Sequence, residues 1–392
     1  MDFTEIKLSG KTRREHDLLG EMEIPEEYYF GVQTMRAVEN FHISRVRLNF
    51  FPRLIHALAD VKQGAAAANR DLGLLDPAIA DAITRACEEL REDRFNEQFV
   101  VDMVQGGAGT STNMNANEVI ANRALELLGH HKGEYGYCHP NNHVNLSQST
   151  NDAYPTAIHL GMYATHLKLV EHLKQLIESF EKKAAEFADV LKMGRTQLQD
   201  AVPMTLGQEF EAYAATLTEE IDRLKTNMRL FYEINMGATA IGTGINADPD
   251  YAELCTKHLR EITGLPLTKA ANMIEATSDT GAFIMNSSAL KRLAVKLSKI
   301  CNDLRLLSSG PRCGLNEINL PPRQPGSSIM PGKVNPVIPE VVNQVAFRVI
   351  GNDLAITLAS EAGQLELNVM EPIIVLSLFE NIEMLVNAMN TL

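Results

Sequence analysis

The chain has 392 residues, of which 45% are hydrophobic and 22% charged, and its formal net charge is −14 at neutral pH. These values are ordinary for a soluble globular protein of two or three domains. The acidic excess and the lack of a basic run argue against nucleic acid as a partner. The chain has no run of about 18 apolar residues and a polar N-terminus, so we expect a cytoplasmic protein that binds no membrane.

Cysteine and histidine usage argues against a metal centre. The five cysteines are widely spaced and form no Cys-x-x-Cys pair, so reduced thiols are expected. The eleven histidines form no His-Glu-x-x-His motif. The glycine segment 106–109 lacks the Lys-Ser or Lys-Thr ending of a P-loop, and no strand–helix–strand pattern suits a dinucleotide. We therefore expect neither a metal nor a cofactor.

Helical periodicity dominates the chain. From Pro52, apolar residues recur at intervals of three and four, and a short helix is predicted from Pro77 to Leu90. Beyond Pro155 the apolar seams become long and heptad-like. They predict helices at 160–187, 210–231, 290–307 and 372–389.

Long apolar seams on successive helices are typical of a bundle with shallow crossing angles. No alternating strand pattern occurs beyond Pro155, so the predicted fold class is all-α with a long central helical bundle. We divide the sequence into an N-terminal helical domain (1–148) and a central long-helix bundle domain (149–392). Few aromatic residues and long seams favour a homo-oligomer with a shared helical core, and a monomeric bundle is the alternative.

Four polar, irregular segments carry the residues best suited to chemistry, namely 106–113, 147–152, 194–200 and 326–336. We expect the first three just before helices, where free N–H groups and the positive end of the helix dipole favour an anion. Taken singly, each is better explained as a helix N-cap, and the fourth as a solvated connector. Four such segments in one chain favour a shared pocket for carboxylates.

Hydroxyls, amides and one lysine, without metal or cofactor, suit proton abstraction next to a carboxylate. The carbanion delocalises its charge into the carboxylate, and aligned donors stabilise the resulting aci-carboxylate. A serine in a closed, donor-rich loop beside Lys333 is a suitable base. The last histidine is His258, so no histidine base lies within 326–336.

The four segments, in this order, resemble the active-site regions of the aspartase/fumarase superfamily. Residues 326–336, Gly-Ser-Ser-Ile-Met-Pro-Gly-Lys-Val-Asn-Pro, resemble its signature loop, and the similarity runs from about Leu18 to the last residue. Residues 337–344 and 106–108 resemble the branch that acts on L-aspartate more than class II fumarases. Fumarases usually carry histidine where Gln197 stands, which also favours that branch.

The resemblance implies an elongated all-α subunit, a homotetramer on a central helical bundle, and active sites composed from three subunits. It implies reversible anti-elimination of ammonia from L-aspartate to give fumarate, a dicarboxylate. A class II fumarase that hydrates fumarate to malate is one alternative, and a non-catalytic helical scaffold of the same fold is another. The resemblance also implies a small C-terminal domain after the bundle, and we expect this sequence, which ends at Leu392, to lack it.

The resemblance also assigns a role to individual residues. The base that takes the Cβ proton is Ser327. The residues that hold the β-carboxylate are Thr110, Ser149, Thr150 and Ser328. Those that hold the α-carboxylate are Thr196, Lys333 and Asn335, with Asn151 and Gln197 near the leaving amine. The pivots for closure of the loop are Gly326 and Gly332, and Arg36 and Glu340 are weaker candidates.

Overall fold

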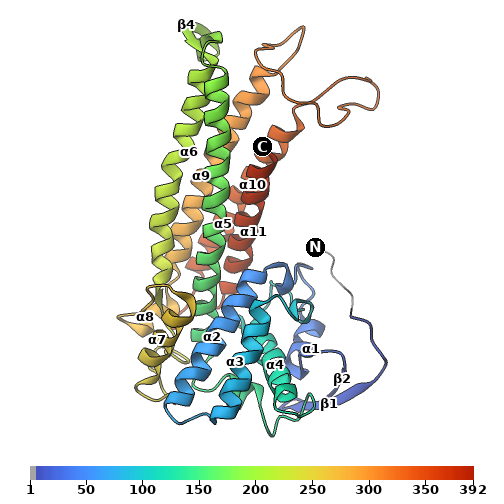
Figure 1. Ribbon diagram of the computed structural model, residues 1–392, viewed down its shortest axis with the longest axis vertical. Coiled ribbons are helices and arrows are strands. Elements are labelled where there is room, and N and C mark those ends of the chain that lie inside the picture. Colours follow the sequence, from blue (N-terminus) through green and yellow to red (C-terminus); the bar gives the residue numbers. More distant parts are fainter. Residues whose placement is uncertain (1–5) are drawn as a thin grey trace. The chain divides into compact units, whose positions relative to one another are not determined.

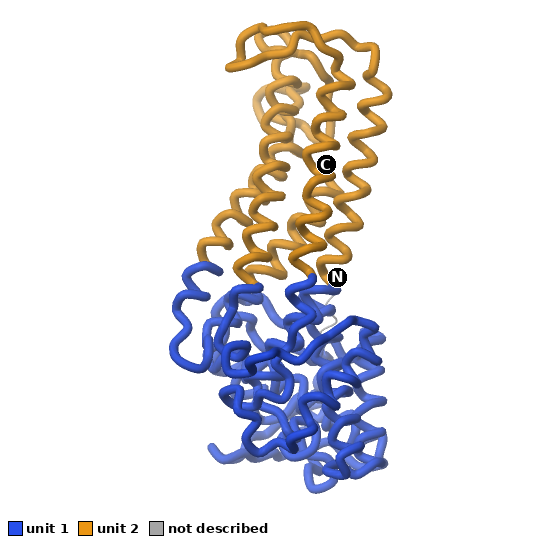
Figure 2. The backbone as a smooth tube through the Cα atoms, turned by 90° about the vertical axis from the view of Figure 1, so that its left-hand side faces the viewer, with its two compact units in different colours: residues 1–164, 229–282, 356–376 blue, residues 165–228, 283–355, 377–392 orange. Residues whose placement is uncertain are grey.

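The computed structural model describes residues 6–392, which divide into two compact units, each made of separate stretches of sequence (Figure 2). Of these residues, unit 1 comprises 6–164, 229–282 and 356–376. Unit 2 comprises 165–228, 283–355 and 377–392. We predicted two domains that are continuous in sequence, with a boundary at residue 148. The compact units are each discontinuous in sequence, so they do not test that boundary, which stays a prediction.

Unit 1 contains the short and medium helices of the chain (Figure 1). They are α1 (Val32–Asn40), α2 (Pro52–Asp71), α3 (Pro77–Arg91), α4 (Thr110–Leu127), α7 (Tyr251–Thr263) and α8 (Met273–Ser278). Both α2 and α3 begin with proline, whose missing N–H costs nothing at the first helical position. The Asp76 carboxylate caps α3 by accepting a hydrogen bond from Ala78 N at 2.8 Å. The helices predicted from Pro52 and from Pro77 are confirmed.

Unit 2 holds most of the long helices, which run side by side (Figures 1 and 2). The helices with most of their length in unit 2 are α5 (Thr150–Glu186), α6 (Leu206–Met228), α9 (Gly281–Leu307), α10 (Val337–Glu361) and α11 (Glu371–Thr391), although α5 and α11 begin in unit 1. The predicted seams are buried, for example through Phe210 on α6 and Leu297 on α9. Polar side chains add contacts between helices, such as Asn343 Nδ2 on α10 with Ser298 Oγ on α9 at 2.8 Å. The predicted bundle of long helices is confirmed.

Three two-stranded sheets accompany the helices of residues 6–392, so the all-α prediction is confirmed in its mainly helical fold and wrong in its lack of strands. The pairs are antiparallel β1 (Thr12–Asp17) with β2 (Gly20–Pro25), antiparallel β3 (Leu191–Thr196) with β4 (Gln199–Thr205), and parallel β5 (Glu233–Ile234) with β6 (Thr268–Lys269). In β1 the inward-facing residues are Arg13 and Glu15, so the buried positions alternate but hydrophobicity does not. A search for alternating hydrophobic residues therefore misses this strand.

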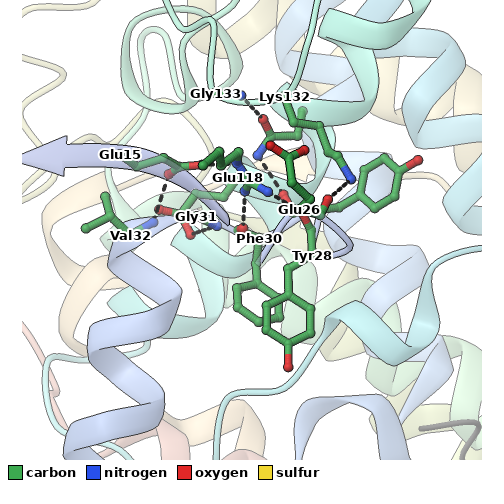
Figure 3. Close-up of polar contacts among 12 residues, drawn as sticks. Glu15, Glu26, Tyr28, Phe30, Gly31, Val32, Glu118, Lys132 and Gly133 are labelled. Atoms are coloured by element: carbon green, nitrogen blue, oxygen red, sulfur yellow. Dashed lines mark hydrogen bonds and ion pairs between the residues drawn. The ribbon is translucent and has the colours of Figure 1, made fainter. Parts of the chain in front are cut away.

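Two carboxylates hold the N-terminus of α1 (Figure 3). Glu118, on α4, accepts hydrogen bonds from Gly31 N at 2.8 Å, from Gln33 N at 2.8 Å and from Thr34 N at 3.0 Å. Glu15, on β1, accepts from the next free amide, Val32 N, at 3.0 Å. The first N–H groups of a helix have no partner within the helix, and the dipole there attracts negative charge. The two carboxylates thus fix α1 against β1 and α4.

Of residues 6–392, only α11 is long and apolar enough to cross a membrane. The apolar window is 72% buried within the protein, as is typical of a core helix. Its first residue is Glu371, a carboxyl that lies buried in unit 1.

The buried Glu371 makes the stability depend on pH. Burial raises the pKa of this carboxyl from 4.5 to about 8, so between these values the folded chain holds a proton that the unfolded chain has lost. The free energy of unfolding therefore falls as pH rises through this window. We expect Glu371→Gln, which stays neutral, to be more stable than the natural chain at about pH 9 but similar to it at about pH 5, in urea titrations.

Glu366→Gln, at an exposed carboxyl five residues earlier, is the matched control and should follow the natural chain at both pH values. Parallel pH profiles for Glu371→Gln and the natural chain would contradict the role of this proton.

Candidate active site

The starts of α4 and α5 bring four of the predicted residues together in unit 1. Thr110 is the first residue of α4, while Ser149 immediately precedes Thr150 and Asn151, the first residues of α5. The two helices are joined by Asn113 Nδ2, which donates to Thr150 Oγ1 at 3.2 Å. Hydroxyls and an amide therefore gather where two helix dipoles present their positive ends.

This contact requires glycine at position 109. Gly109 lies just before α4 with φ 89°, in the left-handed region, and a Cβ there would come within 2.3 Å of the Tyr154 ring on α5. Tyr154 is itself fully buried and so has no room to withdraw. Any side chain at position 109 would separate the two helix starts.

Hydrogen bonds within the chain already use part of this polar group. Ser149 Oγ accepts from Asn151 N at 3.2 Å, and Asp152 Oδ1 accepts from Ser149 N at 2.9 Å, a reciprocal capping arrangement. The N-cap interpretation is thus confirmed for Ser149, whose hydroxyl hydrogen is not used by the cap. The Thr110 hydroxyl donates to Gly107 O at 2.7 Å. The Asn151 amide donates to Ala240 O at 2.7 Å.

Asp152 anchors the start of α5 from inside. Its buried carboxylate also accepts from Gly237 N at 3.1 Å and from Thr239 N at 2.9 Å through Oδ2. Burial raises the pKa of Asp152 to about 6, and the backbone N–H donors oppose that shift. The first turn of α5 is therefore tied to residues 237–239 of unit 1.

Lys62, on α2, is a buried cation that the sequence analysis missed. Its Nζ donates to Asn113 Oδ1 at 2.6 Å, to Asn145 Oδ1 at 3.0 Å and to Gln148 Oε1 at 2.8 Å. Burial lowers the pKa of Lys62 to about 7, while the charge of Asp152 opposes that shift. The signal was present in the sequence, because Lys62 interrupts the apolar stripe of α2 four residues after Leu58.

In unit 2, Thr196 and Gln197 lie at the tip of the β3–β4 hairpin. Gln197 and Leu198 form its two-residue turn with φ values of 55° and 63°, which residues other than glycine, asparagine and aspartate rarely adopt. The expectation that segment 194–200 lies just before a helix is wrong, because β4 follows it and α6 begins only at Leu206. A strained turn thus presents the predicted Gln197.

Segment 326–336 forms an irregular loop in unit 2 whose ends are bound to each other. Gly326 N donates to Lys333 O at 2.8 Å, and Asn335 Nδ2 donates to Gly326 O at 2.8 Å. A Cβ on Gly326 would lie 2.7 Å from Lys333 O, so glycine is needed there. Gly332 has φ 84° and open space around it. Ser328 and Lys333 are exposed on this loop.

The oxygen of Ser327 faces two backbone amides of its own loop. Ser327 Oγ accepts from Ile329 N at 3.3 Å and from Met330 N at 3.1 Å. Donors directed at a hydroxyl oxygen favour the oxygen's negative form, because they stabilise charge where it develops. This geometry suits a serine that acts as a base.

The two weaker candidates have local structural explanations. Arg36, on α1, forms a bidentate pair with Asp17, with Nε–Oδ2 and Nη2–Oδ1 distances of 2.9 Å. This pair lowers the pKa of Asp17 and ties α1 to the β1–β2 hairpin. Glu340 lies in the first turn of α10, where a carboxylate is favourable to the helix dipole. Their roles in a site stay predictions.

The chain is similar to lyases over nearly its whole length. A family model described as Lyase matches residues 20–351. The aspartate ammonia-lyase of Pseudomonas aeruginosa is 65% identical over 98% of this chain and 81% of that protein. The structure of a fumarate lyase:delta crystallin from Brucella melitensis bound to cobalt has a TM-score of 0.94 at 58% identity, covering 97% of this chain and 83% of that one. Class II fumarase from Schistosoma mansoni has a TM-score of 0.91 at 36% identity, covering 97% and 82%.

The strained turn at the hairpin tip should respond to glycine. Leu198 is 70% exposed and its φ is positive, so Leu198→Gly removes backbone strain without removing packing. We expect this substitution to raise the free energy of unfolding by about 0.5–1 kcal/mol, measured by urea titration.

Leu191→Gly is the control, because Leu191 is also exposed, at 79%, but lies within β3 and not in the turn. It should lower stability, since glycine weakens a strand. Equal losses from both substitutions would show that the turn is not strained.

Proposed function

This chain belongs to the aspartase/fumarase family of lyases, and we propose that it catalyses the reversible deamination of L-aspartate to fumarate and ammonia. The observation that carries the proposal is the contrast in identity, which is 65% with an aspartate ammonia-lyase and 36% with a class II fumarase. Gln197, which stands where fumarases usually carry histidine, points the same way.

The proposed reaction begins with removal of a proton from Cβ by the Ser327 alkoxide. The C–H electron pair moves into the β-carboxylate and gives an aci-carboxylate. This intermediate then expels the amine from Cα, and the returning pair forms the double bond of fumarate. Ile329 N and Met330 N support the first step, because both donate to Ser327 Oγ and would stabilise its negative charge.

The two carboxylates of the substrate would be held by different groups. In the proposal, Thr110, Ser149, Thr150 and Ser328 hold the β-carboxylate, where charge develops. The first three are supported by their place at the starts of α4 and α5, where the helix dipoles present their positive ends. Thr196, Lys333 and Asn335 hold the α-carboxylate, with Asn151 and Gln197 near the amine. Hydrogen-bond donors accelerate the chemical step when they bind the aci-carboxylate more strongly than the carboxylate of the substrate.

We propose that the protein assembles as a homotetramer whose active sites combine residues of three subunits. Helix α10 supports this proposal through a row of exposed apolar side chains at Phe347, Ile350, Leu354 and Leu358, spaced by three and four residues. Phe347 and Leu354 are 63% and 62% exposed, and a continuous apolar stripe of this kind marks a contact surface.

We also propose a cytoplasmic location. All five cysteines are free, and four of them, Cys87, Cys138, Cys255 and Cys301, are buried. Free thiols are usual in reducing compartments, whereas extracellular proteins tend to pair them.

The activity is tested by adding L-aspartate to the purified protein and following the absorbance of fumarate together with released ammonia. We expect Ser327→Ala to lower kcat at least about 1,000-fold with unchanged helical circular dichroism, because no other base replaces it. Ser179→Ala, at an exposed serine on α5, is the control and should keep full activity.

Other outcomes separate the alternatives. Hydration of fumarate to malate without ammonia would identify a fumarase. A folded natural chain that is inactive on both substrates would indicate a non-catalytic scaffold. Full activity of Ser327→Ala would remove this residue from the role of base.

The assembly is tested at the apolar stripe of α10. We expect the double substitution Phe347→Glu and Leu354→Glu to convert a tetramer into smaller species, since charges cannot be buried unpaired in a contact. Light scattering after gel filtration measures the mass. Glu88→Lys, at an exposed position of α3, is the control for charge change and should leave the mass unaltered. A stable tetramer with both glutamates present would contradict the assignment of this surface.

A further inference from the structure

The buried amine of Lys62 is surrounded by side-chain amides, and no carboxylate within residues 6–392 forms an ion pair with it. Its three donors point at Asn113 Oδ1, Asn145 Oδ1 and Gln148 Oε1, at distances of 2.6, 3.0 and 2.8 Å. The lysine has no exposed surface. Three acceptors around one nitrogen match the three hydrogens of an ammonium group, which has no lone pair to accept with.

The orientation of two of these amides is set by backbone carbonyls, which only accept hydrogen bonds. Gln148 Nε2 donates to Val144 O at 2.9 Å, so its oxygen must face Lys62. Asn145 Nδ2 donates to Gln148 O at 3.1 Å, so its oxygen likewise faces Lys62. An exchange of nitrogen and oxygen in either amide would leave an acceptor facing an acceptor.

The orientation of Asn113 then follows from the other two. Its nitrogen donates to Asn145 Oδ1 at 3.1 Å, and that oxygen is already fixed as an acceptor. Its oxygen accepts from Lys62 at 2.6 Å. The same nitrogen carries a second hydrogen, which is directed to Thr150 Oγ1 at 3.2 Å. Asn113 is therefore locked as a donor to Thr150.

A hydroxyl that accepts a hydrogen bond keeps its own hydrogen available. In the described part of the chain, no oxygen accepts a hydrogen bond from the Thr150 hydroxyl. Thr150 is 9% exposed and lies at the N-terminus of α5, so this unused donor sits in a largely buried place that favours an anion. If an acceptor stood in place of Asn113 Nδ2, the Thr150 hydroxyl would donate its hydrogen to that acceptor and would have none left for a ligand.

We propose that Lys62 and Asn113 are positioning residues that make the Thr150 hydroxyl a hydrogen-bond donor to a substrate carboxylate. Lys62 fixes the amide of Asn113, and that amide fixes the hydroxyl of Thr150. This inference rests on the proposed function only in taking the anion to be a dicarboxylate. Neither Lys62 nor Asn113 needs to touch the substrate.

A purely structural role explains the network less well. Lys62 lies on the apolar stripe of α2, between Leu58 and Ala65, where a methionine of similar length would pack without burying a charge. A buried cation with neutral partners is costly, and its retention is accounted for by the donor that it creates at Thr150.

Asn113→Asp tests the inference with the smallest change of shape. The substituted carboxylate still accepts from Lys62, but it offers no hydrogen to Thr150, so the Thr150 hydroxyl turns to donate to it. We expect kcat/KM for L-aspartate to fall about 100-fold, most of it in kcat, because the donor acts on the charge that develops in the aci-carboxylate. Succinate, which lacks that developing charge, should bind about tenfold more weakly by calorimetry.

A double-mutant cycle identifies the path of the effect. Thr150→Ala should cost about as much as Asn113→Asp, and the double variant should be no more than about twofold worse than Thr150→Ala alone. Additive losses in the double variant would overturn the inference. So would a kcat/KM of Asn113→Asp within about twofold of the natural protein.

Asn122→Asp is the matched control. Asn122 is another fully buried amide on α4, and its nitrogen donates to Tyr29 O at 2.7 Å, away from Lys62. The control exchanges the same donor for an acceptor, so it should lower Tm to a similar extent while kcat/KM stays unchanged. An equal loss of kcat/KM in the control would show that stability alone explains the effect and would overturn the inference.

A crystal structure of the unmodified protein with succinate tests the same point without a variant. We expect a succinate oxygen within hydrogen-bond distance of Thr150 Oγ1, with Asn113 Nδ2 still donating to that oxygen. Succinate bound elsewhere would overturn the inference. If the natural protein binds succinate through Thr150 but leaves L-aspartate unchanged, the proposed reaction fails and the positioning role stands.

Discussion

The close approach of Gly109 to the ring of Tyr154 is the constraint on which the polar group in unit 1 depends. It places the start of α4 against the start of α5, and the hydroxyls at the two helix ends become neighbours through this contact. Neither helix end alone would bind a carboxylate strongly, because one dipole contributes about 1 kcal/mol or less at an exposed site. Two ends with several hydroxyl groups between them form a set of donors before any ligand arrives.

Two buried charges of opposite sign keep that set rigid. Asp152 is satisfied by three backbone N–H groups and Lys62 by three side-chain carbonyls, so each is compensated by fixed dipoles. Asp152 determines where the backbone of the first turn of α5 lies, while Lys62 determines which way the amides around it point. Position and polarity of the donors are thus fixed separately. Such preorganised donors need no rearrangement when charge develops, which is where they are most effective.

Much of the fold could be predicted from the sequence, because long helices show a regular spacing of apolar residues. The apolar seams of α6 and α9 are local patterns, and burial follows from them directly. The β1 strand escaped notice because Arg13 and Glu15 occupy its buried positions. The hairpin at Gln197 escaped because its turn uses residues that rarely adopt positive φ. In β1 the local rule is overruled by contacts with distant residues, such as those of Arg13 with Tyr28 O and Phe30 O, whereas at the hairpin an exposed turn adopts a backbone conformation that its residues disfavour.

The candidate site divides in the same way. The hydroxyl-rich segments were visible in sequence, and the resemblance named Ser149 and Thr150 at the start of α5. Lys62 was not predicted, because a single lysine in a helix is normally taken to be exposed to solvent. Its place on the apolar face of α2 was the signal that it is buried. Its partners, Asn113, Asn145 and Gln148, come from two other segments, and no spacing rule brings them together. Residues that touch a ligand leave motifs, whereas residues that orient them are recognised from contacts.

The loop that carries Ser327 differs from the polar group in unit 1, because the hydrogen bonds described for it join residues of the same loop. A hydrogen bond between Gly326 and Asn335 joins the two ends of the loop. The two amides that donate to Ser327 Oγ belong to the residues two and three positions after Ser327. None of these contacts depends on the position of the loop relative to any other segment. The two N–H donors that would stabilise the proposed Ser327 alkoxide thus belong to the loop itself, and movement of the loop as a body would leave them in place. In unit 1 the donors are held by contacts between helices, whereas in this loop the proposed base is held by the loop's own backbone.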